Sequence, residues 1–151
     1  PRLGKRFKTK LLNDRKQSLV MLHHFKIVAR EVNSLGGKFS FEWPCYSRGW
    51  NLKELQSFIT KFSIPYVDFD GCSLGLKSSK GVLIKKPWRV ITTSNRLSQN
   101  LHDRKCSGDH THQRCEGSNA KKSAFYINEM ADLILDGLCA PEPPVKRQKQ
   151  K

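Results

Sequence analysis

A short polar stretch of the chain carries side chains that could bind a metal ion. Between positions 106 and 115 the spacing is Cys-x3-His-x-His-x2-Cys, which is not a common zinc-finger pattern. Zinc prefers cysteine and histidine in tetrahedral sets, and histidines two residues apart point the same way from an extended chain. We therefore predict a zinc site with three ligands from this stretch, Cys106, His110 and His112, and with Cys115 or Cys72 as the fourth.

The segment around these ligands lacks the apolar residues that would fold it without a metal. Residues 102–122 show no hydrophobic periodicity, and a segment that cannot bury a core can be stabilised by a bound metal ion instead. His102 is a weaker candidate ligand in the same segment. The alternative is a polar loop whose cysteines and histidines have unrelated roles.

A second group with potential chemistry is the carboxylate of Glu42. It lies at the end of a short apolar run, residues 38–43, that follows a glycine pair and precedes Pro44. This pattern is typical of a buried strand. Ligands of open α/β sheets bind beyond the carboxyl ends of strands, so an acid there is a candidate site residue. The alternative is a structural acid that pairs with Arg48 or Lys86.

Basic residues near the predicted strands could contact phosphate groups. Lys85, Lys86 and Arg89 lie close together in the sequence, and Arg48 follows the first predicted strand. Lysine and arginine commonly contact nucleic-acid phosphates, so we predict that these four residues bind nucleic acid. A solvated basic face is the alternative. Asp70, at the end of the next predicted strand, could orient a neighbouring site group.

The charge of the chain indicates an anionic partner. There are 28 lysine and arginine residues against 13 acids, which gives a formal net charge of +15. Residues 1–16 contribute +6, from seven basic residues and one acid, and residues 140–151 contribute +3, from four and one. An excess of this size is typical of nucleic-acid-binding proteins. A basic protein with no specific partner is the alternative.

The cysteine count and the absence of targeting segments bear on the compartment. The five cysteines are an odd number, and no signal-peptide pattern opens the sequence. We therefore expect free thiols in a reducing compartment, either nuclear or cytoplasmic. No apolar run approaches the roughly 20 residues that a membrane-spanning helix needs, and we expect no membrane partner.

Hydrophobic periodicity predicts the first elements of the fold. Residues 14–35 are predicted as a helix capped by Asp14 and ended by Gly36-Gly37. A strand at 38–43, a helix at 52–61 capped by Asn51, and a strand at 65–70 follow. Strand, helix and strand in this order predict a right-handed βαβ unit with a parallel strand pair.

The later elements are predicted in the same way. Residues 82–84 and 88–92 are predicted as strand, with a break at Pro87. Ser94 is predicted to cap a short helix that ends at Leu101, and a final helix at 124–135 is predicted to stop at Gly137. We expect three segments: a basic arm at 1–13, an α/β domain at 14–139, and a disordered basic tail at 140–151.

Several short motifs, taken together and in order, resemble a known family. They are Glu42-Trp43-Pro44, Ser47-Arg48-Gly49-Trp50, Asp70-Gly71-Cys72-Ser73-Leu74-Gly75, Lys86-Pro87, Thr93-Ser94-Asn95 and Cys106-Ser107-Gly108-Asp109-His110-Thr111-His112. This set, over about residues 14–135, resembles the second part of the catalytic domain of DNA cytosine-5 methyltransferases. It is most similar to the divergent methyltransferase-like domains of phage proteins and of eukaryotic mobile-element (retrotransposon) polyproteins.

The resemblance implies a fold, a role for one acid and a choice of ligand. It implies a partial Rossmann-like (methyltransferase-like) sheet, with Glu42 as the residue that holds a flipped target cytosine. It also favours Cys72 over Cys115 as the fourth zinc ligand. The family's Pro-Cys nucleophile and its S-adenosylmethionine-binding turn precede the glutamate strand. Neither precedes Glu42 here, and Pro44-Cys45 follows the strand, so Cys45 is not assigned as the nucleophile.

The sequence thus predicts the C-terminal half of a methyltransferase-like domain from a mobile-element protein. On its own it would bind nucleic acid, with DNA favoured over RNA, and would be catalytically incomplete. S-adenosylmethionine would bind only to the full-length parent. A non-catalytic, zinc-stabilised DNA- or RNA-binding module is the alternative, and an interaction fragment without a ligand of its own is a third reading. Target sequence and oligomeric state are not predicted.

Overall fold

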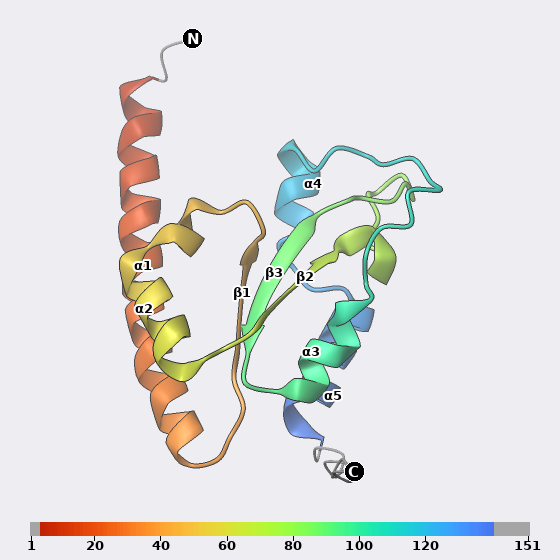
Figure 1. Cartoon of the computed structure of the whole chain (residues 1–151). Helices are drawn as coiled ribbons and strands as arrows, with labels where there is room; N and C mark the ends of the chain where they lie inside the picture. The colour runs from red at the N-terminus through yellow and green to blue at the C-terminus, as the bar shows by residue number, and fades with distance from the viewer. Residues whose placement is uncertain (1–3, 141–151) are drawn as a thin grey trace, which may run out of the picture. The chain divides into compact units, whose positions relative to one another are not determined.

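The computed structural model describes residues 4–140, except for the side chains at 118, 121 and 122. It divides into two compact units, Pro1–Gly37 and Lys38–Lys151, which are taken in turn (Figure 1). Apart from residue 140, the predicted basic tail lies outside the described residues. Within the described part of the chain, no helix has the length and apolar character that a membrane crossing requires.

The first unit is a single long helix, α1 (Lys5–Ser34). Most of the predicted basic arm is therefore helical, because no glycine or proline interrupts residues 5–35 and lysine and arginine are good helix formers. Asp14 is an interior helix residue and not the predicted cap; its carboxylate pairs with Lys10 at 2.7 Å. The predicted stop is confirmed: Gly36 has a φ of +76°, and the Gly37 amide donates to the Val32 carbonyl.

The second unit is built on a three-stranded sheet. The strands are β1 (Ser40–Pro44), β2 (Tyr66–Asp70) and β3 (Pro87–Thr92), in the spatial order β1-β3-β2. β3 pairs antiparallel with both neighbours. The predicted parallel pair of β1 and β2 is therefore wrong. These strands run in the same direction, but β3 is inserted between them because its two faces carry the most buried side chains of the sheet. The small antiparallel sheet does not confirm a Rossmann-like fold.

The pairing register sorts the strand residues onto two faces, because residues directly opposite each other share a face. Glu42 is opposite Val90, and Val90 is opposite Val67. Likewise Trp43 is opposite Arg89, and Arg89 is opposite Asp68. One face therefore carries the valines and Glu42, and the other carries an aromatic and charged row.

The connection between β1 and β2 is helical, as predicted. It consists of a 3-10 turn, η1 (Arg48–Asn51), and the helix α2 (Lys53–Phe62), whose Leu55 and Phe58 are buried. The prediction that Asn51 caps this helix is wrong, because Asn51 is the last residue of η1 and Leu52 is the residue that precedes α2.

Two helices cover the valine-bearing face of the sheet. They are α3 (Asn95–His102) and α5 (Asn128–Cys139), and a short α4 (Gly117–Lys122) lies between them in the chain. The core they form with the sheet contains ten buried residues: Val67, Phe69, Leu74, Leu76, Ile84, Trp88, Val90, Leu97, Leu101 and Met130.

Two predictions about this region need correction. Gly137 lies inside α5, which continues to Cys139, so it does not stop the helix. Its role is close packing: an added Cβ would be 2.6 Å from the Leu97 Cβ. The predicted strand at 82–84 forms only an isolated bridge, between Lys77 and Leu83. The predicted cap of α3 is confirmed, since Ser94 accepts a hydrogen bond from the Leu97 amide.

Candidate metal centre

The structure brings together the four residues whose chemistry favoured a metal site. Their donor atoms, one from each side chain, all lie within 4.8 Å of one another: Cys72, Cys106, His110 and His112. The Cys106 Sγ is 3.7 Å from the His110 Nε2 and 3.4 Å from the His112 Nε2. Tetrahedral zinc, with bonds of about 2.0–2.3 Å, separates its ligand atoms by about 3.3–3.8 Å. The cluster could therefore hold a zinc ion after small side-chain movements.

Cys72 reaches the cluster from the turn that follows β2. This turn, η2 (Gly71–Leu74), is 3-10 helical, and Cys72 is buried in it. An alanine at Gly71 would place its Cβ 2.7 Å from the Leu76 side chain and 3.0 Å from the Trp88 ring. Glycine at position 71 thus lets the turn pack closely on the core, which fixes the position of the Cys72 thiol.

Asp70 connects this turn to the segment that carries the other three ligands. Its Oδ2 accepts a hydrogen bond of 3.0 Å from the Cys106 amide. The Ser73 hydroxyl bridges the same two segments, since it donates to the carbonyls of Asp70 and Arg104. Asp70 is 8% exposed. It therefore orients the backbone of a candidate metal ligand, whereas the sequence analysis had expected it to orient a group near Glu42 or the predicted phosphate-binding residues.

Asp109 fixes the orientation of the His110 ring. Its Oδ1 is 2.7 Å from the His110 Nδ1, so the Nε2 is the nitrogen that faces Cys106. Hydrogen bonds, first from the Ser107 hydroxyl and then from His110, lower the pKa of Asp109 and keep it charged. Metal-binding histidines commonly donate their second ring N–H to such a carboxylate. The sequence analysis missed this role, although an acid next to a candidate ligand was a usable signal.

The electrostatics of the cluster suit a cation. Burial first, and then the hydrogen bond and charge of the neighbouring Cys106 thiol, raise the pKa of Cys72 to about 11. Thiols in such surroundings ionise when a divalent cation compensates the charge. Two thiolates and two imidazoles complete a tetrahedral set, and zinc sites with four protein ligands are structural sites without an open coordination position.

Cys115 and His102, the other candidates, lie outside the cluster. The Cys115 Sγ is 3.3 Å from the Ser123 hydroxyl, and its side chain packs against the hydrophobic core. His102 is exposed and faces Asp103 at 2.9 Å. Of the two candidates for the fourth ligand, the geometry therefore favours Cys72.

Glu42 lies elsewhere, beneath the loop before α5. It is the third residue of β1 and not the predicted last one, because the strand continues to Pro44. Its Oε2 accepts a hydrogen bond of 3.3 Å from the Tyr126 hydroxyl, and its buried Oε1 has no partner among the described residues. Burial raises the pKa of Glu42, against smaller lowering effects of Tyr126 and Lys86. No local sequence signal indicated Tyr126.

Of the predicted phosphate-binding residues, two make internal contacts. Arg89 forms two hydrogen bonds with Asp68, at 2.6 and 2.8 Å. The Lys86 Nζ donates to the Ser123 carbonyl at 2.6 Å. Lys85 and Arg48 are exposed. Phosphate binding by these residues stays a prediction.

Comparisons with known proteins add no family to these observations. No protein-family model, no curated protein and no solved structure matches the chain significantly. The resemblance to cytosine-5 methyltransferases therefore stays a prediction from the motifs alone.

Proposed function

We propose that this chain is a non-catalytic nucleic-acid-binding module whose fold is completed by a structural zinc ion. The observation that carries the proposal is the four-ligand cluster of Cys72, Cys106, His110 and His112. A complete protein ligand set leaves no position for a substrate or an activated water, so it favours a structural role over a catalytic one.

The choice of nucleic acid as the partner is supported by charge. The net charge of +15 creates a positive field that attracts polyanions over distances of a Debye length, about 8 Å at physiological salt. Binding of this kind neutralises phosphates and releases counterions, so it weakens steeply as salt is added.

The metal is tested by elemental analysis of the protein purified without chelators. We expect about one zinc per chain, from the single Cys2His2 set. Replacement by Co²⁺ should give the absorption bands of a tetrahedral site with thiolate ligands. A metal-free protein whose segment 104–116 is nevertheless ordered by NMR would refute the zinc assignment.

Nucleic-acid binding is tested by fluorescence anisotropy with labelled duplex DNA, single-stranded DNA and RNA. We expect the logarithm of the binding constant to fall linearly with the logarithm of the salt concentration. The absence of binding at low salt, or an affinity that salt does not change, would contradict the proposal.

A second candidate function is favoured by one observation at Glu42. Glu42 is a half-buried acid with a raised pKa, and its Oε1 has no partner among the described residues. Such a carboxyl group could donate a hydrogen bond to a nucleobase or accept one from it. This suits the alternative that the chain is the C-terminal half of a cytosine-5 methyltransferase-like domain. In that case a longer parent protein should methylate DNA, and Glu42→Gln should abolish the transfer. A parent with no Pro-Cys motif and no glycine-rich donor turn before Glu42 would exclude this candidate.

A further inference from the structure

A small hairpin beside the metal cluster presents three lysines to solvent. Lys77 pairs with Leu83 in an antiparallel bridge. The turn between them is closed by a hydrogen bond from the Gly81 amide to the Ser78 carbonyl, and Gly81 has a φ of +77°, which few other residues adopt. We call residues 77–85 the lysine hairpin, after Lys77, Lys80 and Lys85.

The core determines the direction in which these lysines point. Leu76 and Ile84 are 3% and 1% exposed, and the Ile84 amide donates to the Leu76 carbonyl. Successive residues of extended chain point to opposite sides, so Lys77 and Lys85 are directed away from the core. All three lysines are exposed, and no carboxylate among the described residues pairs with their ammonium groups.

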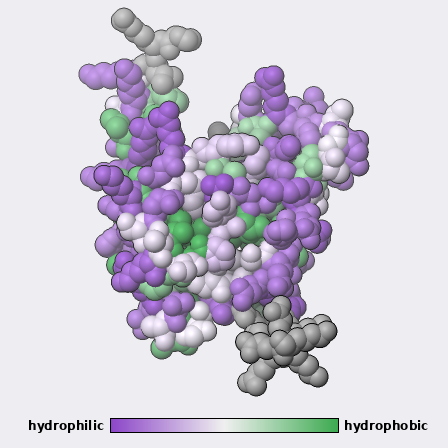
Figure 2. Space-filling model, in the orientation of Figure 1, coloured by the Kyte–Doolittle hydropathy of each residue, from purple (hydrophilic) through white to green (hydrophobic). Residues whose placement is uncertain are grey.

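The surface continues into residues 104–116, which carry three of the candidate metal ligands and are called the metal-binding segment below. The Gln113 amide donates to the Leu83 carbonyl at 2.7 Å, which places this part of residues 104–116 directly beside the hairpin. Together, residues 77–85 and 104–116 contain six basic residues and two acids. One of these acids, Asp109, is bound to His110, and the other, Glu116, is 3.9 Å from Arg114. Hydrophilic side chains predominate on this part of the face that Figure 2 shows.

We propose that the lysine hairpin and the adjoining metal-binding segment form the surface that binds the phosphate backbone of duplex nucleic acid. This inference rests on the proposed function and assigns it a location. Single-strand binders use aromatic side chains as stacking platforms, whereas neither segment contains phenylalanine, tyrosine or tryptophan. The surface therefore offers cations for phosphates without a platform for unpaired bases.

The alternative location is the set of basic residues closer to β3. Two residues of this set, Arg89 and Lys86, already make contacts within the protein. Arg89 is paired with Asp68, and the Arg89 guanidinium lies 4.5 Å from the centre of the Tyr66 ring. Lys86 is bound to Ser123. Breaking such contacts would cost part of any affinity gained, whereas the hairpin lysines are available without rearrangement.

The test compares two matched double variants, each of which removes two positive charges. One is Lys77→Gln with Lys85→Gln in the hairpin, and the control is Lys53→Gln with Lys61→Gln on α2. The probe is a short fluorescein-labelled DNA duplex, titrated at several NaCl concentrations. We expect the hairpin variant to bind at least about tenfold more weakly, with a log–log salt slope about 2 smaller in magnitude. The control should match the unmodified chain.

Each other outcome has a defined meaning. If the unmodified chain binds no duplex at all, the proposed function fails. If it binds and the hairpin variant binds equally well, or both variants lose affinity equally, the proposed function stands and the hairpin assignment is overturned. Tighter binding of a single-stranded probe of the same sequence would overturn the duplex assignment. Circular dichroism and zinc content should not differ among the three proteins, since all four lysines are exposed.

Discussion

The two segments on either side of residue 103 differ in the side chains that could stabilise them. Before it, α3 packs against α5 through buried apolar side chains and a polar network. After it, residues 104–116 contain no alanine, valine, leucine, isoleucine, methionine, phenylalanine, tyrosine or tryptophan. In our proposal, the chain orders one segment by excluding water from apolar side chains and the neighbouring segment by binding a metal ion.

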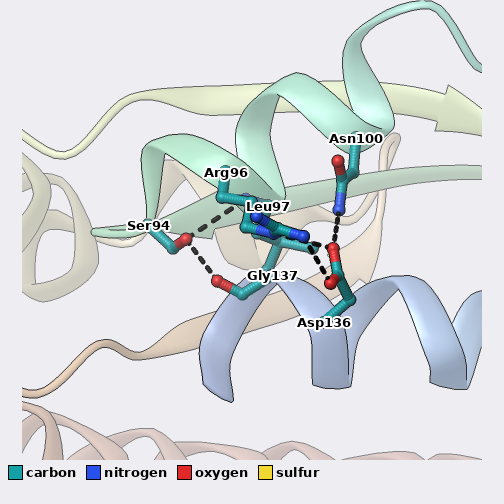
Figure 3. Close-up of polar contacts among 6 residues, drawn as sticks. All are labelled: Ser94, Arg96, Leu97, Asn100, Asp136 and Gly137. Atoms are coloured by element: carbon teal, nitrogen blue, oxygen red, sulfur yellow. Dashed lines mark hydrogen bonds and ion pairs between the residues drawn. The ribbon is translucent and has the colours of Figure 1, made fainter. Parts of the chain in front are cut away.

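The α3–α5 contact combines close packing with directed hydrogen bonds (Figure 3). The Ser94 hydroxyl accepts from the Leu97 amide and donates to the Gly137 carbonyl, so that it links the start of one helix to the end of the other. At the solvent edge, Asp136 accepts hydrogen bonds from Arg96 and Asn100. Leu97 is fully buried beneath this network.

The segment of residues 104–116 is attached mainly by polar contacts, although the Cys115 side chain packs against the hydrophobic core. It is connected to the rest of the unit through Asp70, through the Gln113–Leu83 hydrogen bond, and through the four candidate ligands. Folding the segment costs about 1–2 kcal/mol of backbone entropy per residue, which these few hydrogen bonds do not offset. In our proposal, the metal supplies the missing free energy.

The largest expected effect comes from removing a ligand. Cys106→Ser should abolish zinc binding, because structural zinc sites depend on the full ligand set. Hydrogen exchange should then show loss of protection in residues 104–116, whereas α3 and α5 should stay protected because they rest on the apolar core. The exposed Cys139 provides the control, since Cys139→Ser should retain about one zinc per chain. Global unfolding of the Cys106 variant would refute the separation of the two regions.

The converse change disturbs the packed region and spares the metal. Gly137→Ala would place a Cβ 2.6 Å from the Leu97 Cβ and 2.7 Å from its Cα, so the two helices must separate. After allowing for the better helix propensity of alanine, we expect a loss of about 2 kcal/mol in the free energy of unfolding, measured by urea denaturation. Asp132→Ala, at an exposed site of α5, should change stability little. A loss of zinc from the Gly137 variant would show that the regions are coupled.

A smaller effect should come from the acid behind His110. Asp109→Asn weakens the support of the ring, and comparable changes lower metal affinity by about 10–100-fold. Competition with a chromophoric chelator measures this affinity. Asp103 offers a matched control, because it faces His102 at 2.9 Å outside the cluster. Equal zinc affinities for Asp109→Asn and Asp103→Asn would contradict the orienting role.

The smallest effect concerns Glu42, the acid that lies on the same face of the sheet as Val67 and Val90. Burial raises the pKa of Glu42 above its value of 4.5 in an unfolded chain. The protonated form therefore favours folding below about pH 4.5, and this contribution is lost as the pH rises through the folded-state pKa. Glu42→Gln should be more stable than the unmodified chain at pH 7, and the difference should shrink toward pH 4.

Parallel urea titrations at the two pH values measure this effect. Comparison of the variant with the unmodified chain at each pH cancels the protonation of the metal ligands. Glu31→Gln, at an exposed acid of α1, is the control. A stability difference for the Glu42 variant that does not change with pH would contradict the assigned cause.

Local signals predicted the parts of the molecule that depend on neighbouring residues. The Ser94 cap and the glycine pair after α1 act within one helical turn, so both were predictable. Gly137 was misread as a stop because its role depends on Leu97, which lies forty positions earlier in the chain. The strand order failed for the same reason: nothing near β1 or β2 shows that a later strand separates them.

The candidate site divides in the same way. Residue chemistry and spacing were enough to predict Cys106, His110 and His112, because they belong to one short segment. Cys72 was favoured by the resemblance, and spacing alone left it equal to Cys115. The contact of Glu42 with Tyr126 joins residues 84 positions apart, so a single sequence could not reveal it.

The central position of β3 also imposes an order on folding. Both ladders of the sheet need β3: the β2–β3 ladder begins with the pair Asp70 and Pro87, whereas the β1–β3 ladder must close the longer loop from Pro44 to Trp88, and contacts this distant form slowly. Cys72 precedes β3 and Cys106 follows it. On a ribosome, the strands can therefore assemble only after β3 has emerged, and capture of a metal ion between the two thiols should be among the last steps of maturation.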